Sequence, residues 1–102
     1  EVTAQVLSRK NTPEVAATQL SETISALEKN QSWQASELEV LIRQLQEKHE
    51  YKKSQYFMMI RVALTGKEAT PPLFDTMSAL GKELTLERLK HAQHLLSSAK
   101  TV

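Results

Sequence analysis

The chain has no cysteine, only two glycines and only five aromatic residues among its 102 positions. Without cysteine it has no disulfide framework and no thiolate for catalysis or metal binding, which fits an intracellular protein. No apolar run reaches the roughly 18 residues that a membrane-spanning helix needs. The first ten residues contain no apolar block of the kind that marks a signal peptide. We therefore expect a cytoplasmic protein without a membrane partner.

The scarcity of glycine, together with many leucine, alanine, glutamate, glutamine and lysine residues, favours an all-α fold. Hydrophobic residues make up 40% and charged residues 25% of the chain, a composition that folds. The length suits one domain with a modest core. The sequence thus predicts a compact bundle of five to six short helices. Residues 1–30 are expected to form an N-terminal linker or first helix, and residues 31–102 the main helical subdomain.

Caps and apolar spacing predict where the helices lie. Thr12 is a good N-cap before Pro13 and predicts a helix that ends near Lys29 and Asn30. Further helices are expected at about residues 35–48, 54–65, 71–80 and 82–98, with apolar residues three and four apart. Trp33 precedes the second of these helices and is expected to pack back on it. The expected core stripes are Ala16, Leu20, Ile24, Leu27; Leu38, Leu41, Ile42, Leu45; Phe57, Ile60, Leu64; Leu73, Met77, Leu80; and Leu86, Leu89, Leu95, Leu96.

Residues 60–81 hold both glycines of the chain and two of its three prolines. Gly66 suits the position just after a helix, where a positive φ costs nothing without a Cβ. Thr70 can cap the next helix, with Pro71 at its first position and Pro72 in its first turn. Gly81 then ends that helix. We expect a functional site in this segment, where helix ends and a turn lie close together in the sequence.

Arg61 lies about one helical turn before the first of these breaks, in an otherwise apolar helix. An arginine here can carry its charge to water along its aliphatic stem. It can also present a fork of donors to a phosphate or to the edge of a base. The residues alone leave both interpretations open.

The two halves of the chain differ in charge. Residues 1–50 carry five basic and eight acidic side chains, whereas residues 51–102 carry eight basic and four acidic ones. This asymmetry indicates a polyanionic partner for the basic half. An unevenly charged, solvated surface explains it equally well.

No motif for catalysis is present, neither HExxH, nor a P-loop, nor a glycine-rich dinucleotide signature, and we expect no catalytic residue. His91 and His94 are three residues apart on one expected helix, a spacing that can bind zinc with Glu87 as a third ligand. Solvated histidines explain the pair better, so we expect no metal and no cofactor in this chain. The three methionines could form a soft binding patch, but core filling is the better interpretation.

The second half of the chain contains a series of short motifs. They are Ile60-Arg61, Ala63-Leu64-Thr65-Gly66, Thr70-Pro71, Leu73-Phe74, Leu80-Gly81-Lys82-Glu83 and Arg88-Leu89. In this order and spacing they resemble the C-terminal end of bacterial and organellar glutamyl-tRNA synthetases. The resemblance extends back through Trp33 and covers about 70 residues.

The resemblance implies an all-α anticodon-binding domain of the class I synthetase type. It implies that Arg61, Thr70, Pro71 and Leu73 lie where the family meets the first two anticodon bases of tRNA(Glu). Bases of such a loop can be splayed out, read on their Watson–Crick edges and packed against apolar groups. Arg61 would donate to a base or phosphate, the loop at Thr70 would present backbone and hydroxyl groups, and Leu73 would pack on a base.

The resemblance also implies a parent enzyme that joins glutamate to tRNA(Glu) with ATP and Mg²⁺. This segment lacks the activation signatures and would bind tRNA as a monomer, beside the other synthetase domains and without DNA. The matrix of a mitochondrion or plastid is then an alternative location to the cytoplasm. From their charge alone, we expect four lysines to contact RNA phosphates: Lys52, Lys53, Lys67 and Lys82.

Three positions depart from the family pattern. The family often has glycine where this chain has Pro72, glutamine where it has Met58 and glycine where it has Ser54. These changes stiffen the loop and remove a polar contact. Two rival interpretations remain: a helical protein-interaction module without an RNA role, and a DNA-binding helix-turn-helix with its helices joined near Gly66.

Overall fold

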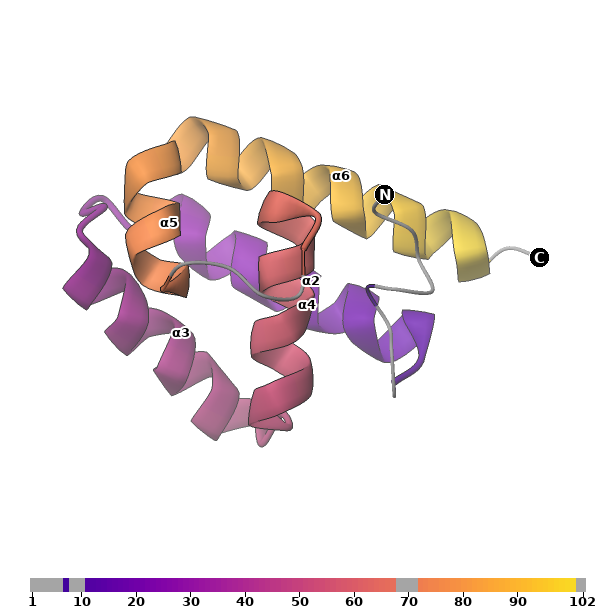
Figure 1. Cartoon of the computed structure of the whole chain (residues 1–102). Helices are drawn as coiled ribbons and strands as arrows, with labels where there is room; N and C mark the ends of the chain where they lie inside the picture. Colours follow the sequence, from indigo (N-terminus) through magenta and orange to yellow (C-terminus); the bar gives the residue numbers. More distant parts are fainter. Residues whose placement is uncertain (1–6, 8–10, 68–71, 101–102) are drawn as a thin grey trace.

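The computed structural model describes residue 7, residues 11–67 and residues 72–100, with side chains up to residue 97. These ranges contain five α-helices and no strand (Figure 1), so the all-α prediction is confirmed. The helices are α2 (Pro13–Lys29), α3 (Ala35–His49), α4 (Lys53–Thr65), α5 (Leu73–Leu80) and α6 (Lys82–Lys100).

The two longest helices, α2 and α6, lie side by side and antiparallel, and α3, α4 and α5 pack around them (Figure 1). The start of α2 follows the sequence signal, because the Thr12 hydroxyl accepts a hydrogen bond from the Val15 N–H at 3.1 Å and Pro13 is the first helical residue. The core face of α2 also agrees with its apolar spacing. Its buried members include Ala16, Leu20, Ile24 and Leu27.

Helix α4 is the most enclosed helix of the described chain. Its expected stripe of Phe57, Ile60 and Leu64 is only part of what it buries, and Phe57 itself is half-buried. A helix that is covered on several sides has no clean amphipathic period, so a single stripe cannot describe it. Its buried residues are Tyr56, Met59, Ile60, Val62, Ala63 and Leu64.

Side chains from elsewhere in the fold bond to carbonyls near the C-terminal ends of three helices. The last carbonyl groups of a helix lack partners within it, and donors or cations placed there are stabilising. The Lys82 Nζ donates to the carbonyls of Glu28 (3.0 Å) and Asn30 (2.8 Å) at the end of α2. The Trp33 Nε1 donates to the Met77 carbonyl in α5 at 2.8 Å. The Arg88 guanidinium donates to the Leu64 carbonyl in α4.

Helix α5 begins later than the sequence suggested. Pro72 precedes the helix with φ −48° and ψ 130°, and Leu73 is its first residue, so the prediction that Pro72 lies in the first turn is wrong. A residue before proline is disfavoured in the α conformation, which makes consecutive prolines a poor helix start. Thr70 and Pro71, the predicted cap and first residue, lie outside the described residues.

The connector between α3 and α4 (residues 50–52) turns on a glutamate in a left-handed conformation. Glu50 has φ 56° and ψ 36°, and is the one non-glycine residue with positive φ among those described. Backbone bonds from Glu50 N to Glu47 O (3.3 Å) and from Tyr51 N to Gln46 O (3.0 Å) form a Schellman closure. The Gln46 side chain adds a bond to the Tyr51 carbonyl at 2.7 Å.

The Glu50 conformation gives a stability prediction. Because glycine lacks the Cβ that makes this conformation unfavourable, Glu50→Gly should raise the free energy of unfolding by about 1 kcal/mol. Gln44→Gly, at an exposed position inside α3, should instead lower it by about 1 kcal/mol. Urea unfolding of both variants checks this, and an equal loss of stability in the two would contradict it.

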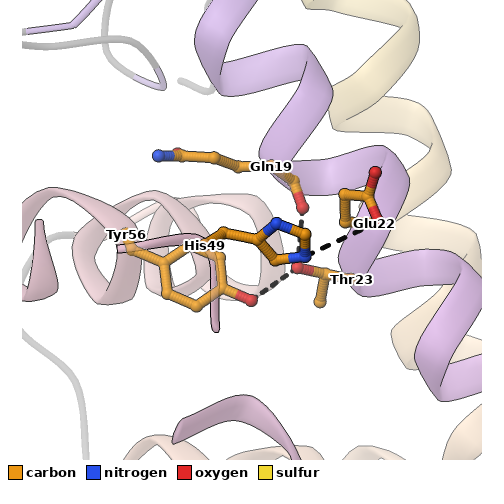
Figure 2. Close-up of polar contacts among 5 residues, drawn as sticks. All are labelled: Gln19, Glu22, Thr23, His49 and Tyr56. Atoms are coloured by element: carbon orange, nitrogen blue, oxygen red, sulfur yellow. Dashed lines mark hydrogen bonds and ion pairs between the residues drawn. The ribbon is translucent and has the colours of Figure 1, made fainter. Parts of the chain in front are cut away.

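A buried hydroxyl pair links α2 to α4. The Tyr56 side chain is fully buried, and its hydroxyl lies 2.6 Å from the Thr23 hydroxyl (Figure 2). Thr23 in turn donates to the Gln19 carbonyl at 2.7 Å, so the tyrosine is the donor in the pair. Burial raises the pKa of Tyr56 above its ordinary value, because the phenolate would lose its hydration.

This raised pKa makes the fold sensitive to alkali. Above about pH 10 the unfolded chain releases the Tyr56 proton while the folded chain keeps it, so the stability falls as pH rises further. Tyr56→Phe should lose about 0.5–1.5 kcal/mol at neutral pH and show a shallower decline between pH 10 and 11.5. Urea unfolding across this pH range measures both effects, and parallel pH profiles of variant and wild type would disprove the assignment.

Candidate functional site

The candidate site is the corner where α4 ends and the chain turns toward α5. Gly66 has φ 77°, and its N–H bonds to the Val62 carbonyl at 2.8 Å, as predicted for a residue that closes a helix. The Thr65 hydroxyl donates to the Arg61 carbonyl at 2.8 Å and accepts from the Lys67 N–H at 3.1 Å. These bonds fix the backbone from residue 61 to residue 67, which we call the α4 corner.

Arg61 lies in the last turn but one of α4 and is half-buried. Its guanidinium makes no hydrogen bond or ion pair with the part of the chain that the structure describes. A guanidinium carries five N–H donors in a rigid fork that matches phosphates, carboxylates and base edges. The α4 corner therefore offers an unused, directional donor set.

An aromatic cluster lies on the same face of α4 as Arg61. Phe57 precedes Arg61 by four residues, the spacing that places two side chains on one helix face. The Phe57 and Phe74 rings meet edge to face, with centroids 6.3 Å apart. The Arg43 guanidinium carbon lies 5.5 Å from the Phe57 centroid and 5.9 Å from the Phe74 centroid, within the range of a cation–π contact. This cluster joins α3, α4 and α5.

The structure brings some of the predicted site residues together and separates others. Arg61 and the exposed Lys67 share the α4 corner, whereas Lys52 and Lys53 lie at the opposite end of α4, with Lys53 about 12 Å from Arg61 along the helix axis. The Leu73 side chain is only 3% exposed and belongs to the core. The Lys82 ammonium is bonded to carbonyls at the end of α2. Thr70 and Pro71 fall outside the described residues.

Sequence reasoning missed Arg43 and Thr65 as parts of this site. Arg43 pairs with Glu39, four residues earlier on α3, with Nε to Oε2 at 2.8 Å, and such a pair is all that the local spacing indicates. Its contact with two rings from other helices has no local signal. Thr65 does have one, since a threonine just before a helix-ending glycine can bond to the backbone on both sides.

A hollow of about 530 Å³ lies between α4 and α6, and its lining includes Ala63, Glu87, Arg88, Lys90 and His91. Lys90 pairs with Glu28 at 3.0 Å. Within the described residues no three histidine or carboxylate side chains come together as a metal site would need. Among the described helices, none is both long and apolar enough to cross a bilayer.

Comparison with known proteins places this geometry in context. A family model described as "Anticodon binding domain" matches residues 1–93. A glutamate–tRNA ligase of Herpetosiphon aurantiacus is 34% identical over 96 residues, 94% of this chain and 19% of that protein. Glutamate–tRNA ligases of Roseiflexus castenholzii and Dehalococcoides mccartyi are 46% and 36% identical over 66% and 92% of the chain, and 13% and 19% of their own length. The chain thus spans less than a fifth of the length of these relatives.

The Arg88 bond to Leu64 predicts a structural role for this arginine. Arg88→Ala should lower the free energy of unfolding by about 1–2 kcal/mol and speed amide exchange at Gly66, because the end of α4 loses its closing donor. Lys90→Ala, which lines the same hollow but loses only an exposed ion pair, should change stability by less than about 0.5 kcal/mol. Equal effects on unfolding and on Gly66 exchange would refute the role.

Proposed function

The chain belongs to the anticodon binding domain family, and on this premise we propose that it reads the anticodon of tRNA(Glu) as part of a glutamate–tRNA ligase. The observation that carries this proposal is Arg61, a half-buried arginine without a partner in the described chain, beside the turn at Gly66. Its five N–H donors are not used by the described residues, so they are available to an external acceptor. Base edges and phosphates of a single-stranded loop are such acceptors.

The aromatic cluster supports the same function. Single-stranded bases bind by stacking on aromatic rings and on guanidinium planes as well as by hydrogen bonding. Arg43, Phe57 and Phe74 supply both kinds of surface on the face of α4 that carries Arg61. In the proposal, this cluster holds one base while Arg61 donates to that base or to its neighbour.

The remaining contacts follow the family pattern. Thr70 and Pro71 present backbone and hydroxyl groups to base edges. Leu73 contacts a base through the small exposed part of its side chain. Lys67 at the α4 corner and Lys52 and Lys53 at the far end supply the phosphate term. Lys82 contributes less to phosphate binding, because its ammonium already donates to carbonyls at the end of α2.

The parent protein in this proposal joins glutamate to tRNA(Glu) with ATP and Mg²⁺ bound in domains outside this chain. Residues 31–102 supply the base-reading surface, and residues 1–30 connect it to the preceding domain while contributing α2 to the core. The bacterial ligases among the relatives favour the cytoplasm over an organelle matrix. The parent enzyme acts as a monomer in this proposal.

Titration of the chain with an anticodon stem-loop of tRNA(Glu) tests the proposal. Arg61→Ala should weaken binding by roughly 5- to 150-fold, the effect of losing 1–3 kcal/mol of base contact, and should reduce discrimination against a stem-loop with altered anticodon bases. Lys29→Ala, at an exposed basic position of α2, is the matched control and should bind nearly as wild type. In the full ligase, Arg61→Ala should raise KM for tRNA and leave KM for ATP unchanged.

Salt and partner specificity decide between this function and its rivals. RNA binding should weaken as salt rises, and a protein-interaction module would bind a protein partner with no response to RNA. Wild-type binding that ignores the anticodon sequence would refute base reading at the α4 corner.

A further inference from the structure

A cavity of about 460 Å³ lies at the end of α4 opposite to the α4 corner. It is bounded by α2 through Val15 and Gln19, by the connector through Glu50, Tyr51 and Lys52, and by the first turn of α4. We call it the Gln19 cavity. None of the residues of the α4 corner lines this cavity, so a ligand bound in it would be distinct from one bound at the α4 corner.

Gln19 is the reason to expect a ligand in this cavity. Its side chain is 3% exposed, and its Oε1 is the one buried side-chain oxygen or nitrogen of the described residues without a hydrogen-bond partner. Figure 2 shows the side chain reaching away from α2, past His49 and above Tyr56. A buried acceptor without a donor is destabilising, and native structures rarely keep one without a use.

The walls of the Gln19 cavity show what kind of donor fits. The His49 and Tyr51 rings both line the cavity and are stacked on each other, with centroids 5.1 Å apart and an interplanar angle of 15°. A further ring can therefore stack only on an outer face of this pair. The His49 Nε2 lies 3.8 Å from the Glu22 carboxylate (Figure 2). The charged residues of the lining are Lys52 and Glu50, one of each sign. The site thus combines a buried acceptor, an aromatic pair and a lysine.

We propose that the Gln19 cavity binds a second nucleotide of the RNA that the α4 corner reads, with a base N–H donated to Gln19 Oε1. The base stacks on an outer face of the His49–Tyr51 pair, and its phosphate lies at Lys52. All bases carry N–H donors on their Watson–Crick edge, and aromatic stacking accepts any of them. The inference rests on the proposed function, because it assigns the ligand to the same RNA strand.

A nucleotide uses Gln19 Oε1, the aromatic pair and Lys52 together, whereas an arginine side chain, the other planar N–H donor common in proteins, leaves Lys52 without a partner. Glu50 in the lining and Glu22 beside His49 would attract a guanidinium, so arginine is the alternative ligand that the experiment must test. Along the axis of α4, Arg61 lies about 9 Å from Gln55 and about 14 Å from Lys52, both of which line the cavity. A base at this distance belongs to a position further along the strand.

Replacement of Gln19 by an apolar residue of similar size separates binding from folding. Gln19→Leu removes the unsatisfied acceptor, so Tm should rise by roughly 4 °C while affinity for the anticodon stem-loop falls about 10-fold. Amide shifts caused by the RNA at residues 49–52 should disappear, and those at Gly66 and Lys67 should persist. Gln44→Leu, at an exposed glutamine of α3, should change neither affinity nor these shifts. Wild-type affinity in Gln19→Leu would overturn the proposal.

A mononucleotide titration of the wild-type chain tests the cavity apart from tRNA. Cytidine monophosphate at millimolar concentration should shift the amides of residues 49–52, whereas ribose 5-phosphate, which has no base, should not. That result supports the nucleotide site even if the stem-loop fails to bind and the proposed function falls. Shifts with arginine amide but none with cytidine monophosphate would show a guanidinium pocket and overturn the assignment.

Discussion

The hydrogen bond from Arg88 to the Leu64 carbonyl decides where α4 ends, and the candidate site depends on that end. A helix finishes with carbonyls that its own N–H groups cannot reach, and the Leu64 carbonyl of α4 makes its bond in a part-buried position. Arg88 supplies the missing donor from α6, and Gly66 supplies the left-handed turn that follows. With both in place, Thr65 can bond to the Arg61 carbonyl and the Lys67 N–H together. The Arg61 side chain is then presented from a backbone with little freedom to move.

This dependence divides the residues that resemble the synthetase segment into two groups. Gly66, Lys82 and Arg88 have structural roles here, since each completes the end of a helix. Arg61 has no such role among the described residues, and nothing in the described fold needs its charge. The basic residues of this segment therefore have different roles, structural for Lys82 and Arg88 and not for Arg61. Net charge in the second half of the chain overstates the cations free for RNA, because two of its eight basic side chains are already bonded to helix carbonyls.

Local signals in the sequence predicted the helices well and the site only in part. The Thr12 cap, the Gly66 turn and the apolar stripe of α2 are short-range features, and each depends on residues a few positions apart. The Trp33 bond to Met77 and the Lys82 bonds to the end of α2 join residues 44 to 54 positions apart, for which no local pattern exists. The same holds for Arg43, whose exposed pair with Glu39 could be predicted while its place against Phe57 and Phe74 could not. Leu73 was expected to pack on a base, but its spacing with Met77 had already indicated the core that it joins.

The groups that the fold leaves unsatisfied lie toward the two ends of one helix. Toward the C-terminal end of α4 the Arg61 guanidinium has donors without acceptors, and beside its first turn Gln19 Oε1 is an acceptor without a donor. The helix between them is buried on several sides and held at both ends, by Arg88 at one and by the Tyr56–Thr23 pair near the other. Such a rod cannot shorten to suit a ligand, so the two sites keep a fixed separation, with Arg61 about 9 to 14 Å along α4 from the residues of the helix and its N-cap that line the Gln19 cavity. A single RNA strand that fills both must match this length as well as the chemistry at each end. The distance between the two sites then adds to the specificity that base recognition provides. A strand of the wrong conformation can bind at one of the two sites but not at both.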